Sequence, residues 1–168
     1  MAIEISIYDP TLSYQGQKKF DCGLKVIDKF VAGSLKQQVA KGLTVAYVLT
    51  DSSQNQRFVG FYTTMMASVG SDLLASAIAG SLPKQLGCLR LVMLGVDKAY
   101  KKQNLGLRLL KHAMLSMKIA SKTMGCIGLY LDADPAAIEL YRKFGFIGLE
   151  EPVPGRILPM FIPARSVA

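Results

Sequence analysis

The sequence predicts a mixed α/β (α+β) fold, built on one sheet that holds both parallel and antiparallel strands. Residues 86–97 form an almost continuous apolar run, which is typical of a central strand. Residues 43–50 and 57–69 flank a polar turn and are rich in β-branched side chains, as in a hairpin. Strand and helix patterns then alternate to the end. Because 51% of the 168 residues are hydrophobic, we expect one domain, residues 1–168, with its own core.

The N-terminal part predicts one strand and a broken helix. Residues 1–8 alternate apolar and polar side chains, which indicates a half-buried strand. A helix is predicted to begin near Gly23, with Asp21 as its N-cap. Gly33 is expected to break it, and the second piece is expected to end near Gly42.

The remaining elements follow the hairpin. Residues 70–84 are expected to hold a short helix and a loop. Gly95, inside the central strand, indicates a bulge or the close approach of a ligand. A further helix is predicted from about residue 103 to about residue 122. The last predicted elements are strands at residues 127–132, 145–150 and 156–162 and a helix at residues 135–144.

The chain is basic, with 20 Lys and Arg against 12 Asp and Glu, a formal charge of +8. This excess fits an anionic cofactor, and it also fits a nucleic-acid partner, so both alternatives stay open. The apolar runs are too short for a membrane span, and no signal sequence opens the chain. We therefore expect a cytoplasmic protein with no membrane partner.

Three cysteines, odd in number and widely spaced, predict neither a disulfide framework nor a metal site. The chain has one histidine, His112, which falls inside a predicted helix. A Cys–His nucleophile pair is therefore disfavoured.

The most informative segment is the turn between the central strand and the next helix. The first four N–H groups of a helix have no intrahelical partner, and the helix dipole adds positive charge, so a phosphate or pyrophosphate fits there. Gly106 allows a ligand to approach the main chain, while Lys101, Lys102 and Arg108 supply positive charge.

This turn, Lys101-Lys102-Gln103-Asn104-Leu105-Gly106, resembles the acyl-CoA-binding motif of the GNAT N-acetyltransferases. The family pattern is Gln/Arg-x-x-Gly-x-Gly/Ala after a strand that ends in Val-Asp. Lys101 replaces Gln or Arg and keeps a charge, and Asn104 replaces the first Gly but tolerates a left-handed backbone. A second segment, from Asp134 to Phe146, resembles Asn-x-x-Ala-x-x-x-Tyr-x-x-x-Gly-Phe of the same family. Asp134 replaces the Asn there, and the positions that match are Ala137, Tyr141, Gly145 and Phe146.

The N-terminal half narrows the resemblance to the toxins that acetylate the α-amino group of aminoacyl-tRNA. The matching segments are Phe20-Asp21-Cys22-Gly23-Leu24, Thr44-Val45, Val59-Gly60-Phe61-Tyr62-Thr63 and Ala67-Ser68-Val69. Together the motifs cover roughly residues 20–150. Met93 stands where that branch usually carries an Arg, and Arg90 is a candidate substitute.

The resemblance implies a GNAT fold with a splayed central sheet, acetyl-CoA as cosubstrate, and direct attack of a primary amine on the thioester. It implies that Tyr141 lies beside the thioester sulfur and protonates the leaving thiolate, for which a phenol is a suitable acid. The backbone of Leu94, Gly95 and Val96 would pair with the pantetheine. The pyrophosphate would lie on the N–H groups of Gln103, Asn104, Leu105, Gly106 and Leu107, near Lys101, Lys102 and Arg108. Asp134, Ala137 and Tyr141 would border the thioester end.

Three functions remain open at this level. The first is a toxin that acts on aminoacyl-tRNA and is paired with a small antitoxin protein. The second is an acetyltransferase for a small-molecule or protein amine, and the third is a non-catalytic acyl-CoA-binding module. A homodimer is also left open.

Overall fold

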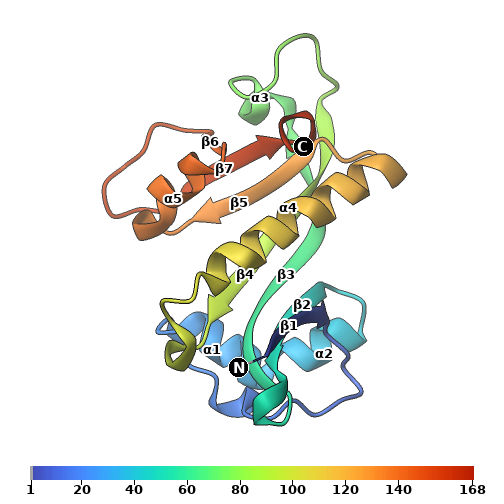
Figure 1. The fold of residues 1–168 in the computed structure, drawn as a ribbon. Coiled ribbons are helices and arrows are strands. Elements are labelled where there is room, and N and C mark those ends of the chain that lie inside the picture. Colours follow the sequence, from blue (N-terminus) through green and yellow to red (C-terminus); the bar gives the residue numbers. More distant parts are fainter. Residues whose placement is uncertain (1) are drawn as a thin grey trace. The chain divides into compact units, whose positions relative to one another are not determined.

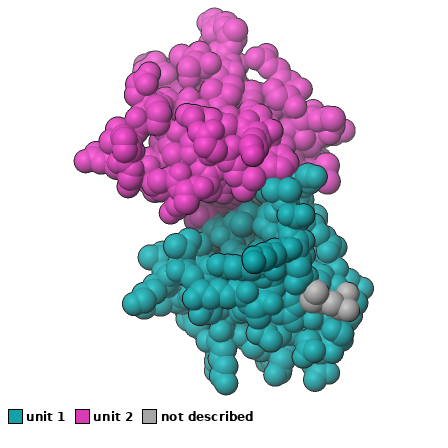
Figure 2. All heavy atoms as spheres, turned by 60° about the vertical axis from the view of Figure 1, so that its left-hand side comes forward, with its two compact units in different colours: residues 1–65, 93–112 teal, residues 66–92, 113–168 magenta. Residues whose placement is uncertain are grey.

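The computed structural model describes residues 2–168 and contains a seven-stranded mixed sheet in the order β1-β2-β3-β4-β5-β7-β6. The chain forms two compact units (Figure 2). Unit 1 comprises residues up to 65 and residues 93–112, and unit 2 comprises residues 66–92 and 113–168. Two long strands and one helix pass from one unit into the other, so each is described where its residues lie (Figure 1).

Unit 1 contains an antiparallel set of strands and two short helices. Register pairs such as Ile5 with Leu49 join β1 to β2, and Tyr47 with Tyr62 joins β2 to β3. The elements are β1 (Ile3–Ile7), α1 (Lys25–Gly33), α2 (Leu35–Ala40), β2 (Val45–Asp51), the first part of β3 (Arg57–Gly70) and the last part of β4 (Gln85–Val96).

Aromatic side chains fill the core of unit 1. Phe58 is buried and makes edge-to-face contacts with Tyr8, Tyr14 and Phe20, whose ring centroids lie 6.5, 6.2 and 5.2 Å away. The apolar sides of α1 and α2 close this cluster with Val31 and Leu35. Both side chains are almost completely buried, so each of these short helices has an apolar side that packs on the core.

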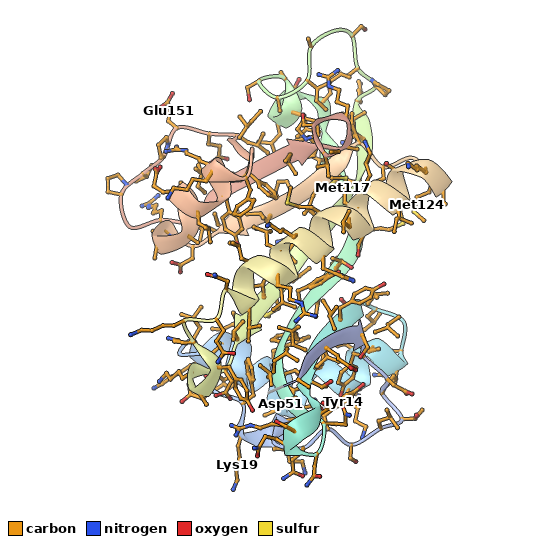
Figure 3. All side chains as sticks on the ribbon, in the orientation of Figure 1. Tyr14, Lys19, Asp51, Met117, Met124 and Glu151 are labelled. Carbon is orange, nitrogen blue, oxygen red and sulfur yellow. The ribbon has the colours of Figure 1, made fainter. Side chains whose placement is uncertain are left out.

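Unit 2 contains the parallel strand pair and the C-terminal hairpin. Its elements are α3 (Ser71–Leu74), β5 (Gly128–Ala133), α5 (Ile138–Lys143), β6 (Ile147–Gly148) and β7 (Leu158–Pro163). Helix α4 (Leu105–Thr123) begins in unit 1 and ends in unit 2. Met117 on this helix is fully buried, whereas Met124 just beyond its end is 48% exposed (Figure 3).

The sheet is splayed at its centre, as predicted. Strand β4 runs parallel to β5, but their register covers only Leu89–Leu91 against Leu129–Leu131. Strand β4 continues to Val96, so the last part of β4 extends beyond that pairing.

Most predicted elements are confirmed, and a few details were wrong. The strand expected at residues 145–150 is only Ile147–Gly148, and the helix expected at residues 135–144 opens with a 3₁₀ turn at Pro135–Ala137. Asp21 does not cap α1, whose N-cap is Leu24. The carboxylate of Asp21 instead accepts the N–H of Gly23, at 3.0 Å, within the turn that precedes the helix.

Candidate functional site

The turn that follows β4 is fixed at its first residue by a buried carboxylate. Asp97 is 6% exposed, and its Oδ1 accepts the N–H of Ala99 at 2.9 Å. Its Oδ2 accepts the N–H of Asp21 at 3.2 Å, and its own N–H donates to the carbonyl of Val59 at 2.8 Å. Three segments of unit 1 are therefore joined at the point where the turn begins.

The next anchor is Tyr100, which ends the 3₁₀ turn Lys98–Tyr100. Its hydroxyl donates to Oδ2 of Asp51 at 2.7 Å, and the guanidinium of Arg57 lies 5.4 Å from its ring centroid. Asp51, at the end of β2, also accepts from the N–H and hydroxyl of Ser53 (Figure 3). These donors lower the pKa of Asp51, Ser53 most of all, so the carboxylate stays ionised as an acceptor for Tyr100.

Left-handed backbone shapes the second half of the turn. Asn104 has φ 56°, which confirms that this residue supplies the conformation that the family pattern assigns to Gly. Lys102 has φ 66°, which the sequence did not indicate. The first intrahelical bond of α4 runs from the N–H of Arg108 to the carbonyl of Asn104, at 3.1 Å.

This helix start leaves backbone donors for a ligand. Because the helical bonds begin at Arg108, the N–H groups of Asn104, Leu105, Gly106 and Leu107 have no acceptor within the helix. A Cβ placed on Gly106 would meet no heavy atom within 4 Å apart from neighbouring backbone of the helix. Open space therefore lies beside the main chain where a pyrophosphate was predicted.

Three basic side chains flank the turn, as predicted, but they differ in what they contact. Lys101 and Lys102 are exposed, and the ion pairs among residues 2–168 involve neither of them. Arg108 instead donates from its guanidinium to the carbonyl of Ile3 at 3.0 Å. One of its N–H groups therefore fastens α4 to β1.

The end of β4 is packed more closely than the sequence indicated. A Cβ on Gly95 would lie 3.3 Å from atoms of Cys22 and Ile27, and a Cβ on Gly60 would lie 2.9 Å from the carbonyl oxygen of Gly95. Contacts within unit 1 thus account for a glycine at position 95, and the expected bulge or ligand approach stays a prediction. Between β2 and β3 the register shifts at Leu49 and Thr50. Leu94 and Val96 adjoin Gly95 on the part of β4 beyond the β5 pairing.

In unit 2, Tyr141 lies on α5 and its ring packs edge-on against Phe146, with centroids 5.5 Å apart. Burial raises the pKa of Tyr141, and the charge of Asp134 raises it further. The phenol is therefore held in its protonated form, as a proton donor requires. Asp134 also accepts the N–H of Ala136 at 2.9 Å, and its carbonyl accepts the N–H of Ala137 at 2.8 Å.

The structure thus gathers the predicted residues into two groups, one in each unit. Leu94, Gly95, Val96 and residues 101–108 lie in unit 1, and Asp134, Ala137 and Tyr141 lie in unit 2.

A family model for the acetyltransferase (GNAT) domain matches residues 47–147. The chain belongs to the GNAT acetyltransferase family. It is an acetyl-CoA-dependent N-acetyltransferase with the GNAT fold, as predicted.

Solved structures resemble this GNAT chain over almost its whole length. A crystal structure of a bacterial toxin is 36% identical, with a TM-score of 0.93 over 99% of this chain and 93% of that one. The AtaTR complex with acetyl-CoA is 26% identical, with a TM-score of 0.82 over 98% and 95%. AtaT in complex with acetyl-methionyl-tRNAfMet shares the fold at 24% identity, with a TM-score of 0.85 over 99% and 97%.

Met93 and Arg90 of the GNAT chain lie in different units. Met93 packs against the core of unit 1. Arg90 in unit 2 pairs with Asp132 at 2.9 Å and lies over the ring of Tyr130, 5.7 Å from its centroid. Residues three apart on a strand point to opposite faces, so Arg90 does not occupy the same position as Met93, and its suggested role as a substitute stays a prediction.

Sequence reasoning missed a ring cluster in unit 1 of the GNAT chain. The hydroxyl of Tyr62 and Nδ1 of His112 lie 2.6 Å apart, and Tyr47 stacks on Tyr62 with centroids 5.3 Å apart. Burial lowers the pKa of His112, and Arg108 lowers it further, so the imidazole is neutral at pH 7. The single histidine was the available signal, but the sequence did not reveal its partners.

Cys22 of this GNAT chain is held as a thiol rather than as a thiolate. Burial raises the pKa of Cys22 to about 11, so its thiol stays protonated near neutral pH. Among residues 2–168, no three His, Cys, Asp or Glu side chains gather as metal ligands. Within the same residues, no helix is both long and apolar enough to span a membrane.

Proposed function

We propose that this acetyltransferase acts on the α-amino group of aminoacyl-tRNA, as the toxin of a toxin–antitoxin pair that blocks translation. The observation that supports this most is the 36% identity to a bacterial toxin across nearly the whole chain. A structure with the same fold contains acetyl-methionyl-tRNAfMet, and the net charge of +8 suits a polyanionic acceptor. Both substrates occur in the cytoplasm, which is the location we propose.

The proposed cofactor loop comprises residues 101–108. The pyrophosphate of acetyl-CoA would accept hydrogen bonds from the N–H groups of Gln103 to Leu107, among which those of Gly106 and Leu107 have no partner within α4. Lys101 and Lys102 would add charge, and Arg108 would add it from beside the loop. The backbone of Leu94, Gly95 and Val96 would pair with the pantetheine.

In the proposed reaction, the neutral α-amine attacks the thioester carbonyl directly. A C–N bond forms, the C–S bond breaks, and the thiolate takes the proton of Tyr141. The nitrogen loses one proton to solvent, and solvent returns one to the Tyr141 phenolate. The raised pKa of Tyr141 supports this assignment, because the phenol is protonated when the thiolate forms. Asp134 and Ala137 precede Tyr141 in unit 2 and would border the thioester end.

The acceptor RNA would lie on a basic surface of unit 1 that includes Lys101, Lys102, Lys36 and Lys41. All four side chains belong to exposed residues. Most of the affinity would come from phosphate contacts, while the reactive amine is selected near Tyr141. An antitoxin would neutralise this surface or block access to Tyr141.

The test is induced expression followed by mass analysis of aminoacyl-tRNA. We expect growth arrest and N-acetylated aminoacyl groups with the wild-type chain, and neither with Tyr141→Phe, although that variant should still bind tRNA. Normal growth, unmodified aminoacyl-tRNA and efficient acetylation of polyamines or peptides would reject the toxin function.

A general amine acetyltransferase is the second candidate, and Met93 favours it. This position usually carries an arginine in the toxins, and Arg90 is committed to Asp132. If the arginine contributes to tRNA binding, its absence lowers affinity for RNA without affecting acetyl transfer. The same expression experiment separates the two candidates.

A further inference from the structure

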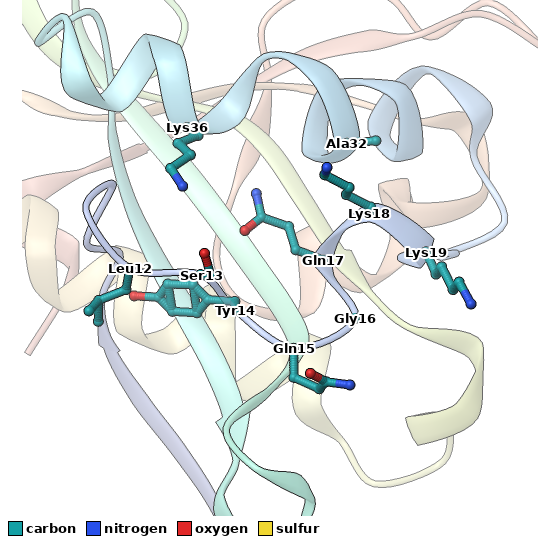
Figure 4. A pocket seen from close by; sticks show the side chains of 10 residues that line it. All are labelled: Leu12, Ser13, Tyr14, Gln15, Gly16, Gln17, Lys18, Lys19, Ala32 and Lys36. Carbon is teal, nitrogen blue, oxygen red and sulfur yellow. The ribbon is translucent and has the colours of Figure 1, made fainter.

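A hollow lies in unit 1, on residues that the cofactor loop does not use. Residues 12–19 form most of its lining, and Ala32 and Lys36 complete it (Figure 4). Its volume is about 390 Å³. Cavities that bind small ligands have volumes of roughly 300–1,000 Å³, so the hollow can take one compact ligand.

The wall of this hollow is held in place by hydrogen bonds to the core. The side chain of Gln17 accepts from the hydroxyl of Tyr8 at 3.0 Å and donates to the carbonyl of Val31 at 3.1 Å. Strand β3 takes part as well, because the N–H of Phe58 donates to the carbonyl of Gln15 at 2.8 Å. A wall fixed before binding lowers the entropy cost of binding.

The lining is positively charged. Lys18 reaches it from the 3₁₀ turn Gln17–Lys19 and Lys36 reaches it from α2, whereas Lys19 contributes to the lining but its ammonium group points away (Figure 4). The ion pairs within residues 2–168 involve none of these ammonium groups, and no carboxylate lines the hollow. An anionic ligand would therefore meet the positive charges of Lys18 and Lys36 and no negative charge.

The kind of cation indicates the kind of anion. Arginine binds planar carboxylates with a two-pronged fork, whereas lysine acts as a point charge and suits phosphate. The hollow contains lysines and no arginine. Tyr14 also lines it, and its ring stacks on Tyr8 with centroids 4.8 Å apart, which places a fixed aromatic group beside the lysines. Fixed aromatic rings and lysines are the groups that bind the base and the phosphate of a nucleotide.

We propose that this hollow is a nucleotide-phosphate site. The ligand is either a free 5′-nucleotide or one nucleotide of an RNA, and the two share the same recognition chemistry. Assigning the ligand to an RNA rests on the proposed function, whereas assigning it to a free nucleotide does not.

The experiment titrates 5′-AMP into ¹⁵N-labelled protein in the presence of saturating CoA, which occupies the cofactor loop. Amide shifts are followed at Gly16, Lys18 and Lys19, and the titration is repeated with deacylated tRNA present. The test variant is K18Q/K36Q. The matched control is K25Q/K29Q, which removes the same charge from the exposed lysines of α1 in the same unit.

We expect saturable shifts at these amides, a loss of AMP affinity of at least about tenfold in K18Q/K36Q, and little change in K25Q/K29Q. Competition between AMP and tRNA identifies the ligand as an RNA nucleotide, and simultaneous binding identifies it as a free one. In the RNA case, K18Q/K36Q also lowers the slope of log K against log salt by about 0.7, which corresponds to one lost phosphate contact.

Shifts confined to residues 101–108, or equal losses in both variants, would overturn the proposal. Acetyl-CoA affinity, measured in parallel, should be unchanged in K18Q/K36Q, which shows that the variant is folded. Failure of the proposed function would appear separately, as unmodified aminoacyl-tRNA, and would leave AMP binding by the hollow intact.

Discussion

Replacing Gly106 with valine tests the cofactor loop with little effect on the fold. Gly106 has no positive φ, and a Cβ added there meets nothing beyond neighbouring helix backbone. Valine has a better helix propensity than glycine. We therefore expect the free energy of unfolding to change by less than about 0.5 kcal/mol in the ligand-free protein.

Binding of acetyl-CoA should respond quite differently. The valine side chain would fill the space through which a phosphate reaches the N–H groups of Gly106 and Leu107. A hydrogen bond to a charged group contributes about 1.5–3 kcal/mol. Loss of one such bond would weaken binding about 10- to 100-fold, from an expected Kd of about 1–100 μM in the wild type.

Calorimetry with acetyl-CoA measures this change, and thermal unfolding confirms that the variant is folded. Gly106→Ala is the matched control, because the family pattern accepts alanine at this position and affinity should stay close to that of the wild type. Unchanged affinity in folded Gly106→Val would refute the proposed loop. A loss in Gly106→Ala as large as that in Gly106→Val would refute the argument from side-chain size.

Five further predictions concern Tyr141, Tyr100, Asn104 and the domain as a whole. Tyr141→Phe should keep acetyl-CoA affinity but lower kcat about 10²- to 10⁴-fold in steady-state assays. Because the pKa of Tyr141 is raised, its phenol stays protonated as the pH rises, so wild-type kcat should not fall between about pH 7 and pH 9.5. Tyr100→Phe removes the hydrogen bond to Asp51 and should weaken acetyl-CoA binding several-fold, with a smaller change in kcat. Equal effects on acetyl-CoA affinity and on kcat would contradict a positioning role for Tyr100. Asn104→Gly should bind acetyl-CoA as the wild type does, whereas Asn104→Val should lower the free energy of unfolding by about 1–2 kcal/mol in denaturant titrations. If residues 1–168 form one domain, calorimetric unfolding should show a single transition, and two resolved transitions would reject that prediction.

Local patterns explain why much of the fold could be predicted from the sequence. The Asn104 conformation followed from the preference of asparagine for left-handed backbone, and the strands and helices followed from periodicity. The close packing at Gly95 could not be predicted, because it comes from Cys22 and Ile27, which are distant in sequence. A pattern along the chain carries no information about such neighbours.

The candidate site shows the same limit. The residues of the turn were predicted, but its two anchors were not. Tyr100 binds Asp51, which precedes it by 49 residues, and Asp97 accepts from Asp21, which precedes it by 76 residues. The positive φ of Lys102 could not be predicted either, because a lysine seldom adopts positive φ. Lys102 does so here within a turn that is fixed at both ends.

The hydrogen bond from Arg108 to the carbonyl of Ile3 can form only after most of the chain has been synthesised. Its partners are 105 residues apart, and β1 is an edge strand of the sheet. At a synthesis rate of roughly 5–20 residues per second, the arginine is added about 5–20 s after the isoleucine. During that interval the nascent chain holds the strand without the helix to which it is fastened. A ribosome that stops before residue 108 therefore leaves a product without this fastening of α4 to β1.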